Sequence, residues 1–192
     1  QLLLLLFAGY ETTASSLSCL MRELLLNPQV ETWLREEIDG LGWPPAPEQA
    51  TTAYDKANAP KLDAVVCEVM RLTPAVGGFF RRTKCSLVID GVVVPKNRVV
   101  QVALAASNRC GSGDLEAFRP QRHLDDGCSA TLLPFGGGER VCLGKPLAEL
   151  EIRLMVVGLF HQLRLVLIPD QDLTLQMLPS PTPRDGLLTK VL

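Results

Sequence analysis

The stretch from Phe135 to Gly144 holds the residues whose types and spacing best suit chemistry, and it reads Phe-Gly-Gly-Gly-Glu-Arg-Val-Cys-Leu-Gly. Gly136 opens a glycine cluster, which lets the backbone turn sharply and approach a flat ligand closely. Cys142 stands just before an expected helix, whose amino-terminal N–H groups favour a thiolate. Arg140 offers a fixed charge to a carboxylate, and the ring of Phe135 can shield the sulfur from water. The stretch therefore predicts a soft anionic ligand held beside a carboxylate-bearing group.

Two simpler interpretations compete with this one. A buried free cysteine beside a glycine turn needs no function, because cysteine is among the most buried residue types. A phosphate-binding loop would need Gly-Lys-Ser or Gly-Lys-Thr after the glycines, and neither follows them here. A thiolate below a haem iron would instead donate electron density that favours cleavage of the O–O bond.

The same stretch resembles the haem-binding signature of the cytochrome P-450 superfamily, Phe-Gly-x-Gly-x-Arg-x-Cys-x-Gly. All six fixed positions match, namely Phe135, Gly136, Gly138, Arg140, Cys142 and Gly144. At average residue usage such a match arises in on the order of one window in a hundred million. The resemblance implies that Cys142 is the axial iron ligand of haem b (iron protoporphyrin IX). It also implies cofactor contacts for Phe135, Gly136, Arg140 and Gly144.

Glu68 and Arg71 are three positions apart on an expected helix over 60–72, so they share one face of it. Such pairs are usually solvated, but this helix is apolar enough to be buried, where an unpaired charge is costly. The pair resembles the family's Glu-x-x-Arg motif. The resemblance implies that it supports the haem loop structurally, so a reading of Glu68 as a general acid is set aside.

A later segment, 118–123, resembles the family loop that brings a second arginine to this pair. Arg122 is that arginine here. Gln121 and His123 depart from the pattern, since Glu and Phe are usual at their positions. The resemblance implies that Arg122 joins the structural network.

The first apolar stretch carries Ala8-Gly9 followed by Glu11 and Thr12. The small pair leaves room beside a helix for a ligand, whereas an acid and a hydroxyl in mid-helix are poor core residues unless they serve something. A Thr12 hydroxyl that bonds back to its own backbone is the alternative. The stretch resembles a family segment that lies over the haem. That implies that Ala8 is near the cofactor and that Glu11 and Thr12 deliver protons to dioxygen there.

Residues 74–81 follow the helix over 60–72 and resemble a segment that lines the substrate pocket. In the family this segment supplies an arginine to a haem propionate. The resemblance implies Arg81 for that role, with Arg82 as the alternative one residue away. An ordinary surface arginine at a strand start is the other interpretation.

The elements that must position these side chains follow from hydrophobic periodicity and turn residues. Asn27-Pro28 indicates a cap and a proline at the first position of a second helix. Asp90-Gly91 between two Val/Ile/Leu runs indicates a hairpin. Helices are expected at 1–26, 28–41, 60–72 and 145–163, and loops at 42–59 and 107–134. The pattern changes to strands over 76–105, with runs at 87–89, 92–94 and 99–105, and further strands are expected at 165–168, 173–177 and 187–191. The predicted class is mainly α with small β-sheets (α+β), as in the C-terminal half of the cytochrome P-450 fold.

Composition narrows the partners. The chain has 192 residues, 47% of them hydrophobic, which is enough to bury a core. Its net charge of -2 does not suggest nucleic-acid binding. The six cysteines include no Cys-x-x-Cys pair, which argues against a zinc site. A chain of this length and apolar content needs no disulfide framework, so reduced thiols are expected. The chain opens at Gln1 in an apolar run, which indicates a helix that has lost its beginning. Residues 1–192 are thus expected to be a partial haem-binding monooxygenase domain that lacks its N-terminal half. The location stays open between cytoplasmic and membrane-associated through a missing N-terminal segment.

The resemblance predicts an oxidoreductase, a haem-thiolate monooxygenase that inserts one oxygen atom from dioxygen into a small apolar substrate such as a sterol, a retinoid or another lipid-like molecule. Electrons would come from a separate redox partner, because nothing here resembles a flavin or nicotinamide site. The three glycines and Gly144-Lys145 are similar to the retinoid-hydroxylating branch and its bacterial relatives. Alternatives are a haem-thiolate isomerase or peroxygenase, against which the Glu11-Thr12 pair argues, and a non-functional fragment unable to hold haem alone.

Overall fold

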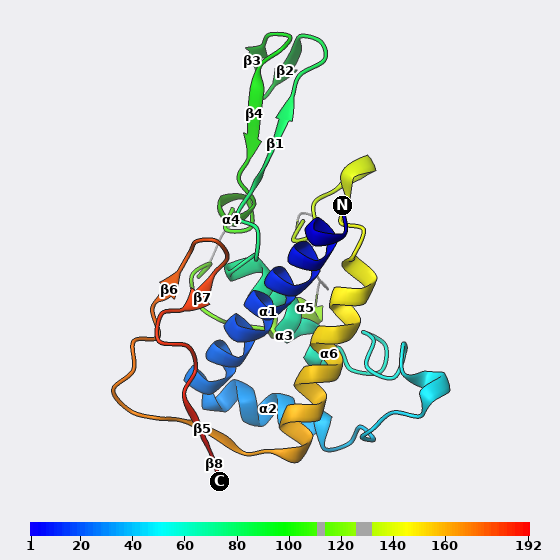
Figure 1. The fold of residues 1–192 in the computed structure, drawn as a ribbon, viewed down its shortest axis with the longest axis vertical. Coiled ribbons are helices and arrows are strands. Elements are labelled where there is room, and N and C mark those ends of the chain that lie inside the picture. Colours follow the sequence, from blue (N-terminus) through cyan, green and yellow to red (C-terminus); the bar gives the residue numbers. More distant parts are fainter. Residues whose placement is uncertain (111–113, 126–131) are drawn as a thin grey trace.

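Three helices form the body of the molecule: α1 (Leu2–Leu26), α3 (Pro60–Leu72) and α6 (Lys145–Gln162). The structure is a computed structural model that describes residues 1–110, 114–125 and 132–192. Each of the three helices contacts the other two, and their apolar faces meet in one core. A narrow arm of β-strands extends from one end of this body, and the small hairpin of β6 and β7 lies along its side (Figure 1). The predicted class, mainly α with small sheets, is confirmed.

The long helix α1 differs along its length. Its second half is core, where Cys19, Leu20 and Leu24 are buried, whereas residues 2–10 are all exposed. A helix that is apolar almost all round is expected to be buried, but the first ten residues of this chain are exposed. By length and composition α1 also resembles a membrane-crossing helix. The buried residues of its second half lie between Ser15 and Leu24, and the helix contacts α3 and α6.

Helix α2 (Pro28–Ile38) begins with the predicted proline, but its predicted cap does not form. The side chain of Asn27 turns back and donates from Nδ2 to the Glu23 carbonyl of α1, at 2.8 Å. Arg35 projects from α2 to the end of α6 and donates to the carbonyls of Phe160 and Leu163. These carbonyls lack helical partners, so Arg35 ties the two helices together.

Helix α3 is the most deeply enclosed helix, and every residue from Leu62 to Leu72 is buried. Its amino terminus is closed by Glu37 of α2, whose carboxylate accepts from the backbone N–H groups of Lys61 (2.8 Å) and Leu62 (2.9 Å). An acidic group at a helix start satisfies free N–H donors and complements the helix dipole. The expected buried helix is confirmed, with its end at Leu72 as predicted.

The strands pair into four antiparallel, two-stranded sheets. In chain order the pairs are β1 (Phe79–Arg82) with β4 (Val99–Val102), β2 (Leu87–Ile89) with β3 (Val92–Val94), β5 (Leu165–Leu167) with β8 (Thr189–Val191), and β6 (Leu175–Gln176) with β7 (Thr182–Pro183). The predicted β2–β3 hairpin forms, and its turn residues Asp90 and Gly91 both have positive φ, 47° and 77°. Together β1 to β4 make the arm in Figure 1.

Several short elements were not predicted. They are η1 (Pro47–Gln49), α4 (Leu104–Ser107), α5 (Arg122–Asp125), η2 (Gly138–Arg140) and β7. Each spans four residues or fewer, which is less than the length over which periodicity can be read. α4 shortens the strand that was expected to continue to Ala105, and β4 ends at Val102.

The prediction of reduced thiols holds for most of the described cysteines. Cys19, Cys85, Cys110 and Cys142 are free. It is wrong for Cys67, which is disulfide-bonded. Cys128 lies outside the described residues.

Candidate functional site

The loop around Cys142 is closed by its own backbone. The Cys142 N–H donates to the carbonyl of Phe135 at 2.9 Å, and the Lys145 N–H donates to the carbonyl of Cys142 at 3.4 Å. Gly136 and Gly138 have φ of 72° and 65°, a left-handed conformation that a side chain would strain. The loop therefore holds an exposed Cys142 thiol directly before α6, as its glycines predicted.

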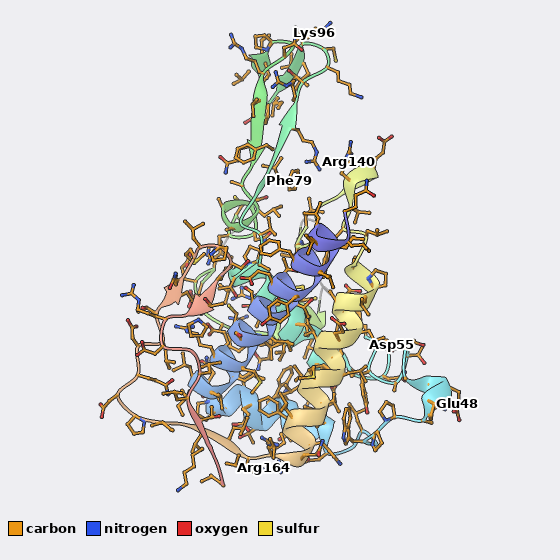
Figure 2. All side chains as sticks on the ribbon, viewed as in Figure 1. Glu48, Asp55, Phe79, Lys96, Arg140 and Arg164 are labelled. Carbon is orange, nitrogen blue, oxygen red and sulfur yellow. The ribbon has the colours of Figure 1, made fainter. Side chains whose placement is uncertain are left out.

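A pocket of about 590 Å³ opens between this loop and the base of the arm. One wall comes from the loop, with Phe135, Gly136, Arg140 and Cys142. The other comes from β1 and the residues before it, including Phe79 and the two arginines of the strand. Figure 2 shows Phe79 at the base of the arm and Arg140 on the loop beside it. Two predicted groups, the thiol and a cationic side chain, thus share one cavity.

The glycines of the loop leave space that a side chain would fill. A Cβ at Gly136 would stand 3.8 Å from the ring of Phe79, and one at Gly144 would stand 3.9 Å from Sγ of Cys142. Gly136 therefore lets the aromatic wall approach the loop, and Gly144 keeps the region next to the sulfur open. Both were predicted as cofactor contacts.

The two arginines of β1 face opposite sides of the strand, because side chains alternate along it. Arg81 shares its face with Phe79, and its guanidinium lies 4.3 Å from the centre of that ring. Arg81 also donates to the Phe80 carbonyl at 2.9 Å. Since the Phe79 ring approaches the Cys142 loop, the geometry favours Arg81 over Arg82, although both line the pocket. Phe79 was missed by the sequence analysis, and its position two residues before Arg81 was the available signal.

A second cluster of charge is buried on α3 and centres on Glu68, whose side chain is 0% exposed. Arg71 donates to both carboxylate oxygens, at 2.8 Å from Nε and 3.0 Å from Nη2. Arg122 donates to Oε1 at 3.0 Å, and so does the Arg119 backbone N–H, at 2.9 Å. The structure thus brings together the three residues predicted to form a network, Glu68, Arg71 and Arg122.

His123 completes this network and was not predicted to join it. Its Nε2 lies 2.8 Å from Oε2 of Glu68, and its side chain is buried. Burial alone would raise the pKa of Glu68, but hydrogen bonds from His123, Arg71 and the Arg119 backbone lower it to about 2. The carboxylate is therefore ionised, so Nε2 of His123 carries the proton between them. The only signal in the sequence was a polar residue where an aromatic one is usual.

The predicted proton-delivering residues lie apart from these two groups, on α1. The Thr12 hydroxyl donates to the carbonyl of Ala8 at 2.7 Å, so the back-bonding alternative is present. Glu11 and Thr12 are half-buried, whereas Ala8 is exposed. None of the three is among the described residues that line the pocket by Cys142. α1 nevertheless begins at the end of the body where the Cys142 loop lies (Figure 1).

Comparison with known proteins adds a family. The family model described as Cytochrome P450 matches residues 1–190. Cytochrome P450 120 of the cyanobacterium Synechocystis sp. is 38% identical over 199 residues, which cover 100% of this chain and 44% of that protein. Steroid 21-hydroxylase of Bos taurus is 35% identical over 192 residues, 97% of this chain and 38% of that protein.

Solved structures agree with the sequence relatives. The retinoic acid-bound cyanobacterial CYP120A1 matches with a TM-score of 0.89 and 35% identity, over 100% of this chain and 45% of that one. A second cytochrome P450, CYP102L1, matches with a TM-score of 0.85 and 28% identity, over 100% of this chain and 45% of that one. The chain thus spans less than half the length of the relatives that it matches.

Proposed function

This chain belongs to the cytochrome P450 family, and from that premise we propose that the complete protein is a haem-thiolate monooxygenase. The resemblance seen at Phe135–Gly144 is confirmed, as is the expected bacterial relative. The proposed reaction inserts one oxygen atom from dioxygen into a small apolar substrate, with electrons from a separate redox partner. Relatives named as a steroid hydroxylase and a 25-hydroxyvitamin D hydroxylase support that reaction class.

The residues around the pocket fit a haem. An exposed thiol beside a helix start suits the iron, and aromatic rings suit the faces of a flat macrocycle. Bound haem would supply the iron at which dioxygen is activated. We propose that Cys142 would hold that iron, while Arg81 and Arg140 would pair with the two carboxylates of the porphyrin. Phe135, Gly136, Gly144 and Ala8 would form the remaining contacts.

The remaining roles concern water and protons. Phe79 and Phe135 would exclude water from the side of the sulfur, and a dry thiolate donates electron density to the iron more strongly. Because the Thr12 hydroxyl gives its hydrogen to the Ala8 carbonyl, its oxygen lone pairs are free to accept a hydrogen bond. We propose that Thr12 thereby orients a proton donor and that the neighbouring Glu11 carries the proton in from solvent.

The observation that carries this proposal is that Cys142 shares one pocket with Arg140 and Arg81. The test is Cys142→Ser in the complete protein, with Cys110→Ser as the matched control because that thiol is also free and exposed but lies outside the pocket. We expect Cys142→Ser to abolish the red-shifted Soret band of the reduced carbon monoxide complex and Cys110→Ser to keep it. A Cys142→Ser protein that kept this band would show that another residue ligates the iron.

A further inference from the structure

A row of alternating charges runs along one face of α6 and continues onto α3. Lys145, Glu149 and Arg153 stand four positions apart, so they share one face of α6 in successive turns. Nζ of Lys145 lies 4.0 Å from Oε1 of Glu149. Nη2 of Arg153 donates to Oδ1 of Asp63, in the first turn of α3, at 2.7 Å. From the start of α6, the order of this charge row is therefore positive, negative, positive, negative.

The pair at the far end of the charge row, Asp63 and Arg153, contributes little to stability. Their side chains are only 10% and 15% exposed. Nε of Arg153 is also buried without a hydrogen-bond partner among the described residues. Taking two charges out of water costs about as much as their attraction returns, unless further hydrogen bonds satisfy both groups. Because the fold gains little from this pair, its position in the row favours an electrostatic role.

The charge row borders the Cys142 loop across a second cavity. This cavity, of about 320 Å³, is lined by all four charged residues of the row and by Phe135 and Gly136 of the loop. Nζ of Lys145 lies 5.8 Å from the centre of the Phe135 ring. The backbone N–H of Lys145 donates to the carbonyl of Cys142 at 3.4 Å. The positive end of the row is therefore fixed beside the loop that carries the thiol.

The order of the charges decides their combined effect on the loop. The row holds two positive and two negative side chains, so its charges sum to zero and the nearest one dominates. Each step of four residues moves a side chain about 6 Å further along α6, and the interaction between charges weakens with distance. Lys145 therefore acts most strongly on the loop, Glu149 opposes it, and the row presents a positive end to the sulfur.

We propose that the charge row sets the reduction potential of the haem iron held by Cys142. Reduction adds one electron to the iron, which the redox partner supplies, and makes the site more negative. A positive charge nearby favours that reduced form, so the row raises the potential. This inference rests on the proposed function, because it requires haem bound through Cys142.

Reductive titration of the haem-loaded complete protein with dithionite, followed by absorbance, measures this potential. Lys145→Met should lower it by a roughly threefold change in the reduction equilibrium, ~28 mV for one electron, and Glu149→Gln should raise it by a similar amount. Asp63→Asn keeps the oxygen that accepts from Arg153 and should raise the potential by less. Lys190→Met is the matched control and should change nothing, because Lys190 is exposed on β8 at the opposite end of the body (Figure 1).

The signs of these shifts separate an effect of charge from damage to the loop. A loosened loop would move the potential in one direction, whichever charge was removed. Lys145→Arg keeps the charge and should keep the wild-type potential. Shifts of the same sign in Lys145→Met and Glu149→Gln, or no shift in either, would overturn the proposal, as would a lowered potential in Asp63→Asn.

The spectrum of the wild type tells a failure of this inference from a failure of the proposed function. If the reduced carbon monoxide complex lacks the red-shifted Soret band, the proposed function fails and this inference fails with it. If the band is present and the shifts do not alternate in sign, only the role of the charge row is overturned.

Discussion

Two regions of this molecule use charge in opposite ways. Around Glu68, one carboxylate accepts from two arginines, a histidine and a backbone N–H, all within the chain and mostly out of water. Around Cys142, the thiol and the side chains of Arg81 and Arg140 are exposed and line an open pocket. In the first arrangement the donors are hydrogen-bonded within the chain and stabilise the fold. In the second, the charged groups remain available to a ligand. Substitutions in the two regions should therefore separate stability from binding.

The largest effect should come from Glu68→Gln. The substitution leaves Arg71 and Arg122 buried or half-buried without their counter-charge, so we expect a loss of about 3–5 kcal/mol in the free energy of unfolding of the complete protein. Urea denaturation followed by circular dichroism measures it. Glu116→Gln is the matched control, because its ion pair with Arg109 involves a glutamate that is 77% exposed and should matter by less than about 1 kcal/mol. Equal losses in the two variants would contradict the comparison.

Protonation of Glu68 at low pH should lower the free energy of unfolding by nearly as much as Glu68→Gln does. The pKa of Glu68 is about 2 in the folded protein against an ordinary 4.5. A lowered folded pKa means that its contribution is complete above about pH 4.5 and is lost as the pH falls towards about 2, roughly 3 kcal/mol in all. Urea midpoints taken across this range should fall more steeply in the wild type than in Glu68→Gln. Parallel curves would mean that other carboxyl groups account for the acid sensitivity.

His123→Phe should be milder, because it removes one donor and keeps an aromatic ring. We expect a loss of about 1–3 kcal/mol, since among the described residues Oε2 of Glu68 then keeps only its bond from Arg71. His161→Phe is the control, because that histidine is exposed on α6 and should change stability by less than about 0.5 kcal/mol. Both are measured by urea denaturation at neutral pH. If His123→Phe left the free energy of unfolding unchanged, packing of the ring and not its hydrogen bond would account for the contribution of His123.

The sequence predicted both regions from local spacing and missed what neighbouring elements add. Cys142 and Glu68 stand in motifs whose residues lie within ten positions of one another, so their pattern is visible along the chain. Phe79 and His123 act across elements, on Gly136 and Glu68, and no local pattern encodes those pairings. The helices were predicted because each spans several turns, whereas two-residue strands such as β7 depend on partners far away in sequence.

The physical reason to prefer one arginine of β1 depends on the direction in which each side chain leaves the strand. The resemblance named Arg81, with Arg82 as the alternative one residue away, but the spacing itself did not distinguish the two. The strand places Arg81 against Phe79, whose ring approaches the Cys142 loop. The difference between the two arginines should matter little for folding stability and more for ligand binding. Substitutions of this pair therefore probe the pocket by Cys142.

Arg81→Ala and Arg82→Ala should each change the free energy of unfolding by less than about 0.5 kcal/mol, because both side chains are exposed. Titration of haem into the cofactor-free complete protein should nevertheless separate them. Loss of a charge-assisted contact to a propionate predicts a Kd about tenfold weaker for Arg81→Ala and nearly unchanged for Arg82→Ala. A weaker Kd for Arg82→Ala instead would mean that β1 presents its other face to the cofactor, and equal losses would mean that the pocket attracts the carboxylates by its summed charge. Either outcome would change how the pocket by Cys142 is thought to bind the cofactor. Neither would change the role of the buried Glu68 network in stabilising the fold.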